Sequence, residues 1–133
     1  MEATFDVTAD PVSGMLRITM GGFFAPGDIA RFTAAIGDGL ARLKTAPNQH
    51  RTLVDIRHMD IQAGEAVAEF QRILANPRTA SPCIAFVVAK SLAAMQVRRA
   101  ASSRAACYFD TVEAAETWLL AIDLGTTPRR SAG

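Results

Sequence analysis

Residues 83–89 read Cys-Ile-Ala-Phe-Val-Val-Ala, an apolar run bounded by Pro82 and Lys90. It is the clearest strand pattern in the chain. A strand that is apolar on both faces is typical of the centre of a sheet that helices cover on both sides. This stretch therefore predicts an α/β fold.

Helical patterns flank this strand on both sides. Residues 64–75 have apolar side chains at helical spacing, and the pattern ends before Pro77, because the residue preceding a proline disfavours the α region. Residues 92–103 are rich in alanine, and their small side chains gather on one face. We expect both segments to be helices that pack on the sheet.

Two more strands and another helix follow from the same periodicities. Residues 52–56 predict a short apolar strand, and residues 106–109 predict a short last strand. Residues 29–43 have the apolar stripe of an amphipathic helix, which Gly37 and Gly39 weaken without breaking. Each strand is thus separated from the next by a helix, which implies parallel, right-handed crossovers.

The last helix begins near residue 110. Asp110 followed by Glu113 has the spacing of a capping box, with an acidic N-cap. Gly125 ends the pattern, so residues 1–124 are expected to form one domain and residues 125–133 a flexible tail.

The chain opens with a hairpin pattern. Residues 5–8 and 15–20 alternate apolar and polar side chains, and turn-forming residues lie between them. The predicted fold is a single mixed α/β sheet of about five strands with four helices, in the order β-β-α-β-α-β-α-β-α.

Composition excludes several classes of protein. The length of 133 residues is that of one domain, and 14 Lys and Arg against 13 Asp and Glu give a net charge of +1. We therefore expect neither nucleic acid nor an anionic membrane as a partner. With no signal peptide and no membrane-spanning run, a cytoplasmic location is expected, and Cys83 and Cys107 are predicted to be free thiols.

Motifs for catalysis are missing from the sequence. There is no phosphate-binding loop, dinucleotide fingerprint, nucleophile elbow or zinc-protease motif. The two histidines, His50 and His58, and the two cysteines fall on four segments, so no metal and no cofactor are expected. A Cys–His nucleophilic pair is disfavoured because nothing in the sequence lowers the pKa of either thiol. We predict that the protein is not an enzyme.

Asp55 is the one acidic residue in an apolar strand. It is expected to pair with Arg57, Arg51 or a helix N-terminus; a catalytic role would need a buried carboxyl without a partner and with a raised pKa. We favour structural pairing.

The sequence resembles the SpoIIAA-like family, which belongs with the STAS domains and is distantly similar to lipid-binding CRAL-TRIO domains. The resemblance is carried by the hairpin, by the strands at residues 53–57 and 84–88, and by the ending at residues 107–120, and it covers residues 4–122. It implies a bacterial cytoplasmic protein without established enzymatic activity. It also implies a lipophilic or small anionic ligand.

STAS antagonists of anti-sigma factors carry an Asp-Ser-Ser-Gly-like motif with a phosphorylated serine at a helix start. The matching residues 60–64 read Asp-Ile-Gln-Ala-Gly, with Gln62 and Ala63 where serines would stand. We therefore predict that the chain is not a phosphorylation switch of that kind.

The candidate ligand site lies at the carboxyl ends of the parallel strands, where open α/β sheets usually bind ligands. Apolar side chains of the loop after the second strand are expected to cover the core, a second subunit or an apolar ligand, and cations are expected to hold an anionic head group. The candidate ligand-binding residues are Phe23, Phe24, Arg57, His58, Lys90, Ser91, Arg98 and Arg99.

The alternative function is a protein-interaction module. On a helical wheel Leu92 and Met95 fall opposite the small-residue face of residues 92–103, where Leu92 covers a neighbouring loop or both side chains line an interface or the rim of a ligand cleft. A homodimer or another protein partner would then use this surface. Ligand binding and protein interaction are both open on the sequence alone.

Overall fold

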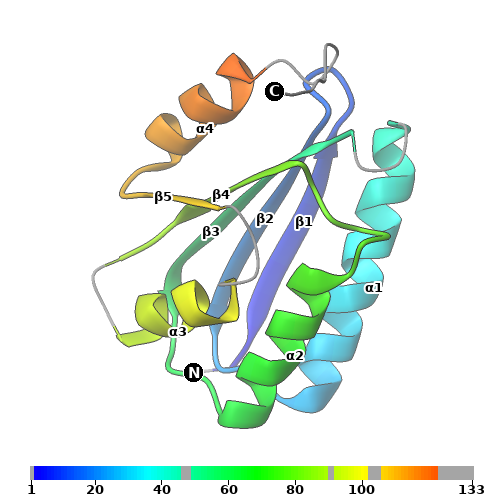
Figure 1. Cartoon of the computed structure of the whole chain (residues 1–133). Helices are drawn as coiled ribbons and strands as arrows, with labels where there is room; N and C mark the ends of the chain where they lie inside the picture. Colours follow the sequence, from blue (N-terminus) through cyan, green and yellow to red (C-terminus); the bar gives the residue numbers. More distant parts are fainter. Residues whose placement is uncertain (1, 46–48, 90–91, 102–105, 123–133) are drawn as a thin grey trace.

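The computed structural model describes residues 2–45, 49–89, 92–101 and 106–122. Its sheet has the strand order β1-β2-β3-β4-β5 (Figure 1). β1 and β2 are antiparallel, and the remaining neighbours are parallel. The mixed sheet confirms the predicted fold class. The strands are β1 (Thr4–Asp10), β2 (Met15–Gly22), β3 (Arg51–Met59), β4 (Cys83–Val87) and β5 (Cys107–Phe109).

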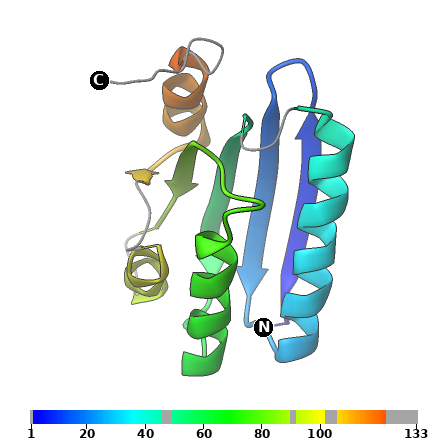
Figure 2. The same cartoon turned by 45° about the vertical axis from the view of Figure 1, so that its right-hand side comes forward.

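Four helices cover the two faces of the sheet unequally. Helices α1, α2 and α3 lie on one face, and α4 lies on the other (Figures 1 and 2). Within the described ranges, no helix is long and apolar enough to cross a membrane. The helices are α1 (Pro26–Leu43), α2 (Gly64–Ala75), α3 (Leu92–Ala100) and α4 (Val112–Ala121).

Several predicted boundaries differ from the structure or lie outside it. β3 continues to Met59, three residues beyond the predicted strand at residues 52–56, so Arg57 and His58 lie within the strand and not after it. α3 ends at Ala100 and not at residue 103, and residues 102–105 are outside the described part of the chain. The predicted tail at residues 125–133 is also outside it, so that part of the domain boundary stays a prediction.

Alternation along each strand separates two cores. In β3, Val54 and Ile56 belong to the cluster beneath α1, α2 and α3, whereas Leu53 belongs to the cluster beneath α4. Successive side chains of a strand point to opposite faces, so Asp55 and Arg57 lie on the α4 side. β3 is therefore apolar toward three helices and partly polar toward the fourth.

Gly39 explains how α1 can lie close to the hairpin. A Cβ atom at this position would come within 2.7 Å of Leu16 Cδ1 and 2.9 Å of Val7 Cγ1. At Gly37 a Cβ atom would meet nothing within 4 Å. Of Gly37 and Gly39, only Gly39 is thus needed for the close approach of α1 to the hairpin.

The last helix begins one residue later than predicted. Its N-cap is Thr111, whose Oγ1 accepts a hydrogen bond of 3.1 Å from Ala114 N, so Asp110 is not the cap. At the other end, the Arg51 guanidinium donates to Leu119 O, Ile122 O and Ser13 O. These bonds satisfy helix-end carbonyls and join α4 to the hairpin.

Candidate functional site

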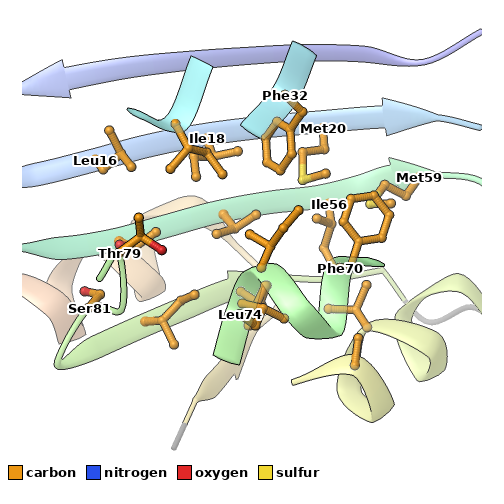
Figure 3. Close-up of a pocket in the computed structure, with 18 of the residues that line it drawn as sticks. Leu16, Ile18, Met20, Phe32, Ile56, Met59, Phe70, Leu74, Thr79 and Ser81 are labelled. Carbon is orange, nitrogen blue, oxygen red and sulfur yellow. The ribbon is translucent and has the colours of Figure 1, made fainter. Parts of the chain in front are cut away.

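A cavity of about 100 Å³ lies between the sheet and helices α1 to α3. Strands β2, β3 and β4 form its floor, and α2 forms part of its roof (Figure 3). The floor side chains are Leu16, Ile18, Met20, Val54, Ile56 and Phe86, and those of α2 are Val67, Phe70, Ile73 and Leu74. The lining is thus largely apolar.

The cavity exists because α2 stands away from the sheet. No Cα atom of α2 lies within 8 Å of a Cα atom of a described strand, although α2 approaches both α1 and α3. Phe70, Ile73 and Leu74 are consequently only half-buried. Protein interiors seldom leave voids larger than a water molecule. The space beneath α2, whose apolar face is incompletely covered, is therefore unusual for a protein interior.

Phenylalanine rings support α2 at one end of the cavity. The Phe70 centroid lies 5.5 Å from that of Phe24 and 6.4 Å from that of Phe32, both at edge-to-face angles. Phe5 joins the cluster with its centroid 5.5 Å from that of Phe32. This end is held by close aromatic packing between α1, α2 and the hairpin.

Gln62 joins two loops at the same end. Its side-chain amide accepts from Phe24 N at 2.9 Å and donates to Gly22 O at 2.9 Å and Asp60 O at 2.6 Å. Its main chain is bound in turn by Gln96 of α3, which accepts from Gln62 N and donates to Gln62 O. We call Phe24, Gln62 and Gln96 the glutamine latch. The latch joins the loop before α1, the loop before α2 and helix α3.

The opposite end of the cavity is polar. His50, Thr52, Thr79 and Ser81 line it, and His50, Thr52 and Ser81 are buried. The Ser81 hydroxyl lies 2.7 Å from His50 O and 2.6 Å from Cys83 O, so it donates to main-chain carbonyls. Thr52 is only 6% exposed, and its hydroxyl has no hydrogen-bond partner among the residues that the structure describes.

Fixed charge does not line this cavity. Among its described lining residues, none is Asp, Glu, Lys or Arg. An ion placed there would lose its hydration without gaining a fixed counter-charge, which is costly. The site suits uncharged, lipophilic chemistry.

The structure separates the two phenylalanines of the candidate site predicted from the sequence. Phe24 is 1% exposed within the aromatic cluster, whereas Phe23 is 43% exposed. Phe24 therefore packs α1 against the core, which is one of the outcomes the sequence allowed.

The predicted basic residues do not converge on the cavity. Arg57 forms an ion pair with Asp55, Arg57 Nη2 to Asp55 Oδ2 at 2.8 Å, on the opposite face of the sheet. Burial acts to raise the pKa of Asp55, but hydrogen bonds from Arg57 outweigh it and hold that pKa below its ordinary value. The predicted structural pairing of Asp55 with Arg57 is present.

His58, another residue of the predicted ligand site, is exposed.

The remaining residues of the predicted sites belong to α3 or precede it. Arg98 lies over the Tyr108 ring, with its guanidinium carbon 4.1 Å from the ring centroid, and Arg99 is exposed. Lys90 and Ser91 lie outside the described residues, as does the side chain of Leu92. Met95 is 57% exposed, so it points outward, and its role in an interface stays a prediction.

The polar groups of the cavity were missed by sequence reasoning. His50 was considered only as a metal ligand, and Gln62 was considered only as a replacement for serine. Thr52 carried one usable signal, because it begins an apolar strand and has the side-chain parity of Val54 and Ile56.

The chain resembles solved structures in fold. An uncharacterized protein of the DUF3478 family with a SpoIIAA-like fold, from Shewanella loihica, matches with a TM-score of 0.66 and 18% identity, covering 88% of this chain and 93% of that one. An anti-sigma factor antagonist from Mycobacterium paratuberculosis matches with a TM-score of 0.62 and 12% identity, covering 89% and 94%. No family model and no curated protein matches the sequence. These likenesses show that the fold is SpoIIAA-like, as predicted.

Proposed function

We propose that this SpoIIAA-like chain is a non-enzymatic binding protein for a small lipophilic molecule, which it holds beneath α2. The observation that carries the proposal is the largely apolar cavity under α2, whose Cα atoms all lie more than 8 Å from those of the described strands. A ligand there would cover the half-exposed side chains Phe70, Ile73 and Leu74. Burial of apolar surface contributes roughly 25 cal/mol per Å², so such a ligand needs no strong polar contact to bind.

The cavity size indicates the scale of the ligand. Its volume of about 100 Å³ is somewhat smaller than an engineered core cavity of about 150 Å³ that accepts benzene. A ring or chain of roughly six carbons is the fitting scale. A longer chain requires α2 to move outward, and helix contacts with α1 and α3 are easier to rearrange than a strand ladder.

This proposal moves the binding site from the predicted carboxyl edge to the sheet face. The small anionic ligand that the resemblance implies gains no support from a lining without Lys or Arg among its described residues. Support for the edge site is also reduced because Arg57 is paired with Asp55 on the far face. A lipophilic ligand is the part of the prediction that the geometry favours.

The experiment is a ¹⁵N NMR titration of the chain with cyclohexane. We expect saturable shifts of amide signals in α2 and in the middle of β3. Ile73→Phe should fill the cavity and weaken binding at least tenfold, and Gln71→Phe, on the exposed side of the same helix, should bind as the wild type does. Shifts that never saturate, or equal binding by both variants, would contradict the proposal.

The second candidate function is a protein-interaction module, and we infer its contact surface from three exposed apolar side chains. Phe23, Ile61 and Met95 are 43%, 53% and 57% exposed. Each immediately precedes a residue of the glutamine latch, whose hydrogen bonds link the three segments that carry these side chains. The fold neighbour described as an anti-sigma factor antagonist adds support for a protein partner.

A second copy of the chain is the partner that this surface fits best. Exposed Glu65 lies in the first turn of α2, soon after Ile61, and exposed Arg99 lies one helical turn after Met95, so the segments that carry the apolar side chains also carry opposite charges. A twofold contact can pair one copy's Glu65 with the other's Arg99. The net charge of +1 opposes such self-association only weakly.

Light scattering at rising concentration tests this second function. We expect the wild type to reach the dimer mass and Met95→Asp to stay monomeric. Leu120→Asp, which places the same charge at a 50% exposed apolar position of α4, should dimerise like the wild type. A wild type that stays monomeric up to millimolar concentration would contradict the homodimer.

A further inference from the structure

The polar end of the cavity holds a buried hydroxyl in need of a partner. Thr52 is 6% exposed and lines the cavity, and no described residue hydrogen-bonds to its side chain. The great majority of buried polar side-chain atoms in native proteins are hydrogen-bonded. Valine would fill the same space in a strand without this demand. A threonine here therefore points to a group that enters the cavity.

A second hydroxyl lies at the same end. Thr79, in the segment between α2 and β4, lines the cavity and also has no side-chain hydrogen bond within the described ranges. Thr52 pairs in register with Leu16, and Figure 3 shows Leu16, Thr79 and Ser81 together at one end. Met59 and Phe70 lie at the other end in that view. The cavity therefore has a hydroxyl-bearing end and an aromatic end, where the lining amides of Gln62 and Gln96 are already hydrogen-bonded within the protein.

We infer that the cavity takes an uncharged amphiphile, such as an alcohol or a ketone, whose oxygen hydrogen-bonds to the Thr52 hydroxyl and whose hydrocarbon part points toward Phe70. This inference rests on the proposed ligand-binding function and specifies the ligand class and orientation. The absence of fixed cations from the described lining argues against a carboxylate or phosphate head group. A hydroxyl both donates and accepts, so it suits an alcohol or a carbonyl oxygen equally.

Matched probes of one ring size test the inference by NMR titration. Cyclohexanol carries the head group, cyclohexane lacks it, and cyclohexanecarboxylate at pH 8 carries a charge in its place. The variant Thr52→Val removes the hydroxyl at nearly constant volume. Thr52→Ser keeps the hydroxyl, and Thr19→Val makes the same change at an exposed position on the other face of β2.

We expect Thr52→Val to weaken cyclohexanol binding roughly three- to tenfold, the effect of one lost hydrogen bond. The same variant should bind cyclohexane as well as or better than the wild type. Thr52→Ser and Thr19→Val should keep the wild-type ratio of the two affinities, and cyclohexanecarboxylate should bind least.

The titrations distinguish a wrong head-group assignment from a wrong ligand-binding function. If cyclohexane binds but Thr52→Val leaves the cyclohexanol affinity unchanged, or lowers both affinities equally, the head-group assignment is wrong while the lipophilic site stands. Binding of the carboxylate as tight as that of cyclohexanol would overturn the uncharged head group. If no probe binds the wild type, the proposed function fails together with this inference.

Discussion

Gln96 pairs with both main-chain groups of Gln62: its Oε1 accepts from Gln62 N at 2.7 Å, and its Nε2 donates to Gln62 O at 2.9 Å. The Gln62 side chain is then free to bind the loop before α1, through Phe24 N and Gly22 O. One glutamine thus orients the other. The aromatic cluster that includes Phe24 packs directly beneath this arrangement.

The latch predicts unequal effects of two substitutions. Gln62→Ala leaves Phe24 N buried without its acceptor, and should lower the free energy of unfolding by about 2 kcal/mol. Gln96→Ala removes two half-buried bonds at positions that water can reach, and should cost about 1 kcal/mol. Urea denaturation of both variants measures the difference. A larger loss for Gln96→Ala than for Gln62→Ala would show that Gln96, and not Gln62, is the main support.

Gly37 and Gly39 of α1 predict stability changes of opposite sign. Gly37→Ala introduces a methyl group into open space in a helix interior, so it should stabilise the protein by roughly 0.5–1 kcal/mol. Gly39→Ala brings a Cβ atom within 2.7 Å of Leu16 Cδ1 and 2.9 Å of Val7 Cγ1, so either these packed side chains or α1 must shift. We expect a loss of about 1–3 kcal/mol. Thermal unfolding of the two variants measures the sign of each stability change. Stabilisation by both substitutions would mean that α1 lies farther from β2 than described.

The Asp55–Arg57 pair predicts a pH dependence of stability. The folded-state pKa of Asp55 lies below its ordinary value of 3.8, because hydrogen bonds and charge from Arg57 outweigh the effect of burial. A lowered folded-state pKa contributes stability that is complete above the unfolded-state pKa and is lost as pH falls through the folded one.

Asp55→Asn should therefore lower the free energy of unfolding by about 1 kcal/mol at pH 7, a value reduced by the partial exposure of Arg57. The gap to the wild type should close below pH 3.8. Asp6→Asn, at an exposed position of β1, is the control and should change little. Urea titrations from pH 3 to pH 7 give the comparison. A gap that does not begin to shrink as the pH falls below 3.8 would show that the carboxylate charge is not what stabilises the fold.

Local patterns explain why the fold was predictable. The strand at residues 83–87 and the helix at residues 64–75 each carry their apolar periodicity within a dozen residues, and each was found near its predicted place. The face on which Arg57 lies was equally readable from alternation with Val54 and Ile56. The predicted site at the carboxyl ends of the strands was based only on the position of Arg57 after the predicted strand, and not on the face to which its side chain points.

The cavity depends on the distance between α2 and the sheet. The apolar periodicity of the sequence does not determine that distance. The same apolar face of α2 would fit a helix in direct contact with the sheet or one held away from it. What holds α2 is non-local, because Gln62 binds partners that are 34, 38 and 40 residues away. No local motif identifies such a residue, and Gln62 was accordingly read only against a serine motif.

The buried hydroxyl of Thr52 gives the last prediction, which concerns the protein without ligand. A hydroxyl enclosed without a protein partner costs about 1–3 kcal/mol unless water binds it. Thr52→Val should therefore raise the free energy of unfolding of the ligand-free protein by about 1 kcal/mol, and Thr19→Val should leave it nearly unchanged. Because a ligand that binds only the folded state adds to stability, saturating cyclohexanol should reduce or reverse the advantage of Thr52→Val. Urea midpoints with and without cyclohexanol give both comparisons in one experiment. If Thr52→Val destabilises the ligand-free protein by more than 1 kcal/mol, the hydroxyl already has a partner in the folded chain, and Thr52 supports the strand and not a ligand.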